Sequence, residues 1–240
     1  MSLQHAAGNI LQRAVDLDSK KRYTEALVCY QEGLQVLVDV LKEQQGDKRI
    51  YLRGKFEEYM KRAEQIKALI EKLKKEGNFH EQIHVQNDST GHSYTSVFGR
   101  FLDEDVTKIT IEDPYIRIYH QCQNLVRFCE LAVTKCSNLQ VLEVITGSDG
   151  SDQAKWLNEL KVSLSQRNIS LIVNFSATLH DRQILLNTGW IIKIGRGLDY
   201  FKAPETKFSL GVFDLNLRPC HETTIDIFHS NSVKSSESSN

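Results

Sequence analysis

The stretch 180–200 reads HDRQILLNTGWIIKIGRGLDY, and its pattern predicts a β-hairpin. Two apolar runs, 184–186 and 190–194, have the length and composition of short strands. Between them lies Asn187-Thr188-Gly189, and asparagine and glycine both tolerate the positive φ of a tight turn. We therefore expect two antiparallel strands joined at residues 187–189.

The hairpin also brings charged residues together at one end. His180 and Arg182 precede its first strand, and Lys193 and Arg196 lie at the end of its second. An imidazole and three cations held on a rigid backbone can bind phosphate. The alternative is a surface hairpin with solvated charges.

Upstream of the hairpin, strands alternate with helices. This alternation predicts crossover connections and a mostly parallel sheet. The expected strands are 106–111, 139–146 and 169–175, the helices between them are 119–134 and 151–166, and further strands follow the hairpin at 208–217 and 224–228. Binding sites in such sheets form beyond the carboxyl ends of the strands. The candidate phosphate- or lipid-binding residues at these ends and in later segments are Arg117, His180, Arg182, Lys193, Arg196 and Arg218.

The N-terminal part has a helical pattern instead. Apolar residues recur at alternating steps of three and four in three segments between residues 7 and 76. A short polar connection, 42–48, joins the second and third segments and makes them antiparallel neighbours. The three stripes predict a small three-helix bundle.

This bundle has apolar residues to spare. Met60 lies about 100° around its helix from the stripe residue Tyr59, and the second helix carries Val36 and Val38 outside its own stripe. Surplus apolar residues on adjacent helices predict an outer groove for an amphipathic helix, with Glu64 available to a basic residue. A thicker core, or exposed residues of no consequence, would give the same pattern.

Specific strings in this segment resemble the MIT (microtubule interacting and transport) domain. They are Ala14-Val15-x-Leu17-Asp18, Arg22-Tyr23-x-Glu25-Ala26-Leu27 and Tyr59-Met60-x-Arg62-Ala63-Glu64. The resemblance implies a bundle whose groove between helices two and three binds C-terminal helical motifs of ESCRT-III subunits. In that groove Met60 matches the family's apolar position and Glu64 its acidic partner for a motif arginine. The expected groove residues are Leu34, Val38, Phe56, Met60, Glu64 and Lys67.

The C-terminal part resembles the phospholipase D-like domain found fused to an MIT domain. The strings Ile111–Arg117, His180–Arg182, Trp190–Phe201 and Arg218–Thr224 carry this resemblance. Active phospholipase D enzymes use His-x-Lys-x4-Asp followed by Gly-Ser, and two such halves form one site. Here Arg182 and Asn187 replace the lysine and the aspartate, and Gly195-Arg196 stands near the Gly-Ser position, about one residue out of register.

Two functions follow from these resemblances. The first is a non-catalytic adaptor that binds ESCRT-III tails and acidic or phosphoinositide-bearing membranes, forms a homodimer and acts in cytokinetic abscission. It would be cytoplasmic, and peripheral on late endosomes and at the midbody. The alternative is a phosphodiesterase or nuclease that uses His180 in a dimeric site.

Composition sets further bounds. With 240 residues and a formal net charge of −1, a protein that is basic throughout is excluded, and we expect no nucleic-acid partner. Five cysteines without a C-x-x-C pair predict neither zinc nor disulfides, and we expect no cofactor. The fold class is therefore α + α/β, with a bundle at 1–78, a linker at 79–92, a mixed α/β domain at 93–230 and a disordered tail at 231–240.

Overall fold

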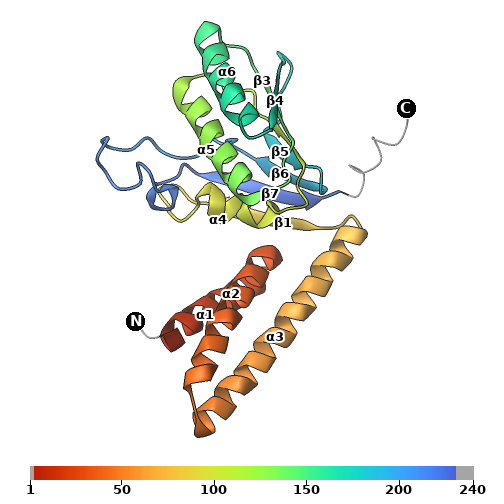
Figure 1. Ribbon diagram of the computed structural model, residues 1–240, viewed down its shortest axis with the longest axis vertical. Coiled ribbons are helices and arrows are strands. Elements are labelled where there is room, and N and C mark those ends of the chain that lie inside the picture. Colours follow the sequence, from red (N-terminus) through yellow and green to blue (C-terminus); the bar gives the residue numbers. More distant parts are fainter. Residues whose placement is uncertain (1–2, 231–240) are drawn as a thin grey trace. The chain divides into compact units, whose positions relative to one another are not determined.

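The computed structural model describes residues 3–230. The chain divides into two compact units, Met1–Glu81 and Gln82–Asn240 (Figure 1). The first unit is helical and the second combines a sheet with helices. This arrangement confirms the predicted fold class, α + α/β.

The first unit is a three-helix bundle. Its helices are α1 (Leu3–Ser19), α2 (Tyr23–Glu43) and α3 (Gly46–Lys75). The expected apolar stripes supply the core, in which Ala14, Ala26 and Ile66 are completely buried. Helices α1 and α2 pack closely at Gly33, where an added Cβ would lie 2.7 Å from Cγ of Leu11. The close packing along these stripes explains why a periodicity of three and four predicted the bundle.

An ion pair fixes α3 against α1. The guanidinium of Arg62 donates to both carboxylate oxygens of Asp18, at 2.7 and 2.8 Å. The hydroxyl of the buried Tyr30 lies 3.4 Å from the same carboxylate. Burial, together with this carboxylate, raises the pKa of Tyr30 to about 12. Arg62 therefore stabilises the bundle, while its neighbours on α3 remain available to other contacts.

The second unit is built on a seven-stranded sheet in the order β1-β7-β6-β5-β2-β3-β4. Its helices α5 and α6 cover one face of this sheet (Figure 1). The strands are β1 (His80–Val85), β2 (Lys108–Glu112), β3 (Val141–Thr146), β4 (Ser170–Phe175), β5 (Gln183–Leu186), β6 (Trp190–Ile194) and β7 (Thr223–His229). The helices are α4 (Tyr94–Phe98), η1 (Gly99–Phe101), α5 (Tyr119–Lys135), α6 (Ser151–Ser165) and η2 (Leu215–Leu217).

The sheet is mixed rather than mostly parallel. Strands β2, β3 and β4 are parallel, as their helical crossovers predict. The hairpin then places β5 antiparallel to β2, and β6 and β7 continue the antiparallel pattern. The expectation of a mostly parallel sheet was therefore wrong. It considered only the three crossover strands, whereas the hairpin strands join the same sheet in antiparallel orientation.

Two further segments differ from expectation. The stretch 79–92 was expected as a linker in which 83–85 could form a short strand. It contains β1, which is longer than that and lies beside β7 at the edge of the sheet. The predicted strand 208–217 is wrong: this segment is a loop that ends in η2. Gly211 has a φ of +84° there, which interrupts extended backbone. The tail 231–240 lies outside the described residues.

An aromatic cluster packs α4 and α5 against the segment that follows the hairpin. Tyr94 contacts Phe128, Tyr200 and Phe201 with its ring, and its hydroxyl donates to the carbonyl of Leu198. The five cysteines are buried free thiols. Among the described residues, no helix is both long and apolar enough to cross a bilayer.

Candidate functional site

The bundle carries a groove of about 430 Å³ between α2 and α3. All the groove residues expected from the sequence line it: Leu34, Val38, Phe56, Met60, Glu64 and Lys67. Leu27, Gln31, Gln35 and Ala63 complete the lining. The structure therefore brings these side chains to one surface, which a thicker core would not do.

Side chains in the groove form an apolar floor with charged residues beside it. Leu34 and Ala63 are almost fully buried, whereas the side chain of Met60 is 40% exposed. Glu64 and Lys67 follow on the next turns of α3 and are exposed. This arrangement can accept the apolar face of a helix and pair with charges along its edges.

The groove extends further than the sequence indicated. A second hollow of about 460 Å³ adjoins it and shares Val38 and Phe56. Ile50, Arg49 and Arg53 line this hollow. Ile50 is 71% exposed. Ile50 is apolar at a position outside the α3 stripe, and that signal could have identified the extension.

In the described part of the second unit, the most buried charged residue is Asp113, at the carboxyl end of β2. Its side chain is 4% exposed, and its Oδ1 accepts the backbone N–H of Tyr115 at 3.0 Å. Burial raises the pKa of the Asp113 carboxyl, while the N–H groups of Tyr115 and Leu198 and the charge of Arg182 oppose that rise. Sequence reasoning did not assign Asp113 a role, although polar residues at strand ends were the signal.

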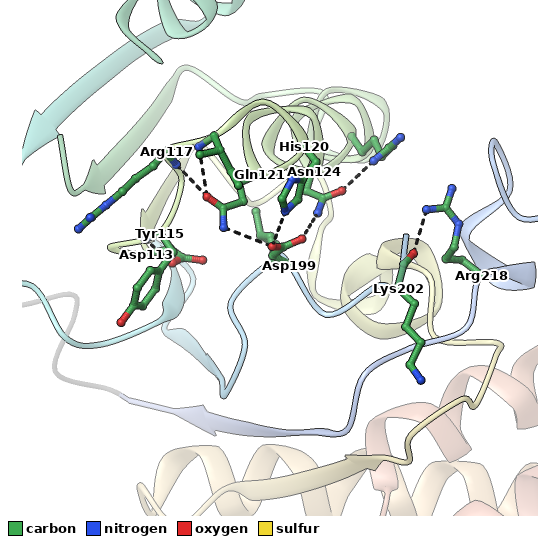
Figure 2. A network of polar contacts seen from close by, with 12 residues as sticks. Asp113, Tyr115, Arg117, His120, Gln121, Asn124, Asp199, Lys202 and Arg218 are labelled. Carbon is green, nitrogen blue, oxygen red and sulfur yellow. Dashed lines mark hydrogen bonds and ion pairs between the residues drawn. The ribbon is translucent and has the colours of Figure 1, made fainter. Parts of the chain in front are cut away.

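A second carboxylate, Asp199, ties the segment after the hairpin to the start of α5 (Figure 2). It accepts from the side-chain amides of Asn124 at 2.9 Å and Gln121 at 3.3 Å, and Nε2 of His120 lies 3.0 Å away. Gln121 in turn accepts the backbone N–H of Arg117 at 3.2 Å. The network holds the strand ends and α5 in one arrangement.

Two of the predicted cations converge on one aromatic ring. The guanidinium carbons of Arg182 and Arg117 lie 4.2 and 5.7 Å from the ring centre of Tyr115. Arg182 also donates to the carbonyl of Gly195 at 3.0 Å, and Arg117 donates to the carbonyl of Pro114 at 2.7 Å. These contacts fix both guanidinium groups at the end of the sheet.

The hairpin brings two more predicted cations to the same end. Lys193 is exposed on β6, where it is paired in register with Gln183. Arg196 is also exposed, and its Nε donates to the carbonyl of Glu222 at 3.1 Å. We call Arg117, Arg182, Lys193 and Arg196 the cationic edge. Its side chains are close enough to the surface to contact an anionic partner.

His180 precedes Arg182 and is exposed. Among the described residues, none forms a hydrogen bond or ion pair with its ring. Asn187, which occupies the family's aspartate position, lies at the opposite end of β5. Its Oδ1 accepts the backbone N–H groups of Thr107 and Lys108 at 2.9 and 3.1 Å. Asn187 therefore fixes the start of β2.

Arg218 does not join the cationic edge, and its expected role in phosphate binding is corrected here. Its side chain is only 5% exposed. It donates to the carbonyls of Gly211, Lys202 (3.2 Å) and Val212 (2.9 Å). Burial, together with the nearby charge of Arg127, lowers the pKa of Arg218. The residue is a structural cation beneath the loop that follows Lys202.

Comparison with known proteins agrees with this division into two units. Residues 5–68 match the MIT (microtubule interacting and transport) domain, and residues 91–229 match a phospholipase D-like domain at the C-terminus of MIT. The mouse (Mus musculus) protein named MIT domain-containing protein 1 is 48% identical over 234 residues, which cover 95% of this chain and 94% of that protein. The chain therefore belongs to the family of proteins that join an MIT domain to a C-terminal phospholipase D-like domain.

Membership confirms the resemblance expected for both halves of the sequence. The groove thus lies in an MIT domain, and the cationic edge lies in a phospholipase D-like domain. Among the described residues, histidine, cysteine and carboxylate side chains form no cluster of three or more that could hold a metal ion.

The close contact between Gly197 and Asp113 yields a prediction for this domain. An added Cβ at Gly197 would lie 1.8 Å from Oδ2 of Asp113, and Gly197 has a φ of +61°. We expect Gly197→Ala to lower the free energy of unfolding by about 2–4 kcal/mol, because it combines a clash with backbone strain. Urea unfolding followed by tryptophan fluorescence measures this, since both tryptophans, Trp156 and Trp190, lie in this domain.

Gly99→Ala is the matched control. A Cβ there would meet Thr95 at an ordinary 3.6 Å, and its φ of −56° suits any residue. Its effect should stay within about 1 kcal/mol. Equal stability of the two variants would contradict the constraint at Gly197.

Proposed function

We propose that the protein is a non-catalytic adaptor that joins ESCRT-III subunits to acidic membranes. The MIT domain binds the C-terminal helical motifs of those subunits. The phospholipase D-like domain associates with acidic or phosphoinositide-bearing bilayers and forms a homodimer. The adaptor acts in cytokinetic abscission, at the midbody and on late endosome membranes.

The observation that carries this proposal is the groove between α2 and α3. It combines a half-exposed Met60 over an apolar floor with a flanking carboxylate, Glu64. With its extension it follows α3 from Arg49 to Lys67, about 27 Å along the helix axis. That length suits a helix of about five turns lying between α2 and α3.

Charges along the groove favour one kind of occupant. Near one end the lining includes three cations, Lys42, Arg49 and Arg53, and one carboxylate, Glu57. Arg53 pairs with Glu57 and Lys42 pairs with Asp39, whereas Arg49 forms no ion pair with the described residues of this lining. Near the other, Glu64 is available to a basic side chain, and Lys67 lies beside it. An amphipathic helix with acidic residues at one end and a basic residue towards the other complements this distribution.

Met60→Asp tests the groove directly. The change places a charge on the apolar surface that receives the partner helix, so affinity should fall by about 2 kcal/mol or more, roughly 30-fold. Fluorescence polarisation with labelled C-terminal helices of ESCRT-III subunits measures this affinity.

Val15→Asp is the matched control, because Val15 is 38% exposed on α1 and Met60 is 40% exposed on α3. Circular dichroism should report unchanged helical content for both variants. Undiminished binding by Met60→Asp would mean that the partner uses another face of the bundle.

The membrane part of the proposal is supported by the cationic edge. Lys193 and Arg196 are exposed at the end of the sheet, beside the fixed guanidinium of Arg182. Cations near a bilayer surface gain about 1 kcal/mol each from anionic lipids. Their neighbour His221 has a lowered pKa, chiefly because of burial and also because of the charges of Arg196 and Lys202, while the carboxylates of Asp199 and Asp88 oppose this shift.

A non-catalytic role is supported by the positions of the motif residues. A nucleophilic histidine needs a group that orients it. His180 is exposed, whereas Asn187 lies at the far end of β5 and is engaged with Thr107 and Lys108. Arg182, in the lysine position, is engaged with Gly195 and Tyr115.

Reversing two charges tests the cationic edge. Lys193→Glu combined with Arg196→Glu should weaken binding to vesicles containing phosphatidylserine by about tenfold or more at low salt. The difference should shrink as salt screens the charges. Vesicle co-sedimentation measures it.

The control makes the same charge change elsewhere in the domain, with Lys155→Glu and Lys161→Glu on the exposed surface of α6. It should bind as the unaltered protein does. Equal losses in both double variants would indicate a response to net charge alone and would contradict a specific edge.

Dimerisation would strengthen both attachments. Two MIT domains on one dimer could bind neighbouring tails of a polymer. The second attachment would then gain from a high effective concentration. A low affinity of each single groove for one tail is then sufficient for stable attachment of the dimer.

A further inference from the structure

The loop between Lys202 and Arg218 exposes large apolar side chains to an unusual degree. Phe208 is 99% exposed, Phe213 94% and Leu210 85%. Single exposed apolar residues are common on protein surfaces. Three large ones within six residues, all nearly free of protein contact, form an exposed apolar patch of the kind that marks an interaction site.

The base of this loop is firmly held. The N–H of Lys202 donates to the carbonyl of Pro219 at 2.9 Å, and Phe201 forms an antiparallel bridge with Cys220. The buried guanidinium of Arg218 donates to the carbonyl of Lys202, where the loop begins, and to those of Gly211 and Val212 within it. Burying a cation is costly without such partners. These contacts therefore fix the backbone of the loop, while the side chains of Phe208, Leu210 and Phe213 remain outside the core.

The form of the loop favours a bilayer as the occupant. Figure 1 shows it as a blue segment that projects from the body of the domain. Phe213 borders a hollow of about 430 Å³ beside Tyr94 and Arg127, whereas Phe208 and Leu210 are not among the residues that line it. A projecting tip needs a matching pocket on a protein partner, whereas the interior of a bilayer imposes no such shape. Phenylalanine and leucine are suited to the boundary between headgroups and acyl chains.

Polar groups around the tip are compatible with shallow insertion. The backbone forms turns within the tip, where the carbonyl of Thr206 accepts the hydroxyl of Ser209 at 2.9 Å and that of Ser209 accepts the N–H of Val212 at 3.4 Å. The carboxylates Glu205 and Asp214 lie outside the apolar run, so they can stay at headgroup level.

Cations lie beside the base. Lys202 begins the loop and pairs with Asp88 at 2.6 Å. The exposed Arg196 of the cationic edge donates to the carbonyl of Glu222, shortly after the loop ends. Lys207 adjoins Phe208 within the loop and is exposed. Anionic headgroups could contact these cations while the tip enters the bilayer.

We propose that the loop from Lys202 to Arg218 is a membrane-insertion loop, in which Phe208, Leu210 and Phe213 enter the acyl-chain boundary of an anionic bilayer. This inference rests on the proposed membrane association and adds the element that penetrates the bilayer.

The test uses the full chain and vesicles of phosphatidylcholine with about 30 mol% phosphatidylserine. The first variant changes Phe208, Leu210 and Phe213 together to serine. Its vesicle affinity should fall by about tenfold or more, because the apolar contribution is lost. The control changes Ile172 and Phe175 of β4 to serine, residues that are 42% and 51% exposed, and it should bind normally.

A second measurement locates the tip. Leu210→Cys provides an exposed thiol for the environment-sensitive dye NBD, since the five native cysteines are buried. Anionic vesicles should shift its emission to the blue, and quenchers in the acyl region should reduce it. A dye at Phe175→Cys should not respond.

The outcomes separate this inference from the proposed function. If the unaltered protein binds vesicles, but the serine variant binds equally and the dye does not respond, the loop is not the inserting element. If the unaltered protein fails to bind, membrane association itself fails, and the loop proposal with it. If the dye shifts without vesicles and light scattering finds that the serine variant loses a dimer, the tip is a self-association surface, which overturns the proposal.

Discussion

The phospholipase D-like domain depends on how the segment from Gly195 to Phe201 crosses the end of the sheet. Gly197 lies so close to the carboxylate of Asp113 that no side chain fits there. Two residues later, Asp199 binds the first turns of α5. The segment is thus held between the sheet and the helical layer by two carboxylates. Because Arg182 binds Gly195, the same constraint fixes part of the cationic edge.

This constraint changes how the charged residues of the hairpin are interpreted. Its charged residues suggested a phosphate site or the remains of a catalytic one. In the folded domain, Asn187 and Arg182 have defined structural contacts, and Arg218 is buried under a loop. Exposed cations remain at Lys193 and Arg196. A surface for anions is therefore compatible with this scaffold without the chemistry of the active enzymes.

Periodicity predicted the helical bundle because each stripe had to be buried by the others. The same reasoning left Met60 and Val38 unassigned to the core, and both line the groove. The crossover strands were predicted for a similar reason, since strands alternating with helices restrict the topology. The family resemblance indicated an MIT domain and a phospholipase D-like domain, and the comparisons confirm both matches.

Other features could not be read from the sequence, because they depend on contacts distant along the chain. The alternating pattern at 208–217 resembles a strand, but no neighbouring strand pairs with it, and the exposed loop is the result. Arg218 resembled a ligand-binding cation, and only the folded loop reveals the carbonyls around it. Asp113 adjoins Gly197 although they are far apart in sequence. Ile50 extends the groove because residues of α2, among them Val38 and Leu41, line the same hollow, and the sequence does not show that they do.

The central claim is that one chain connects a helical tail to a membrane. A flotation assay with a labelled ESCRT-III tail peptide, anionic vesicles and the full-length protein tests it most directly. The peptide should float with the vesicles only when the protein is present. If the protein floats while the peptide stays in solution, or if neither floats, the two domains do not form the proposed link.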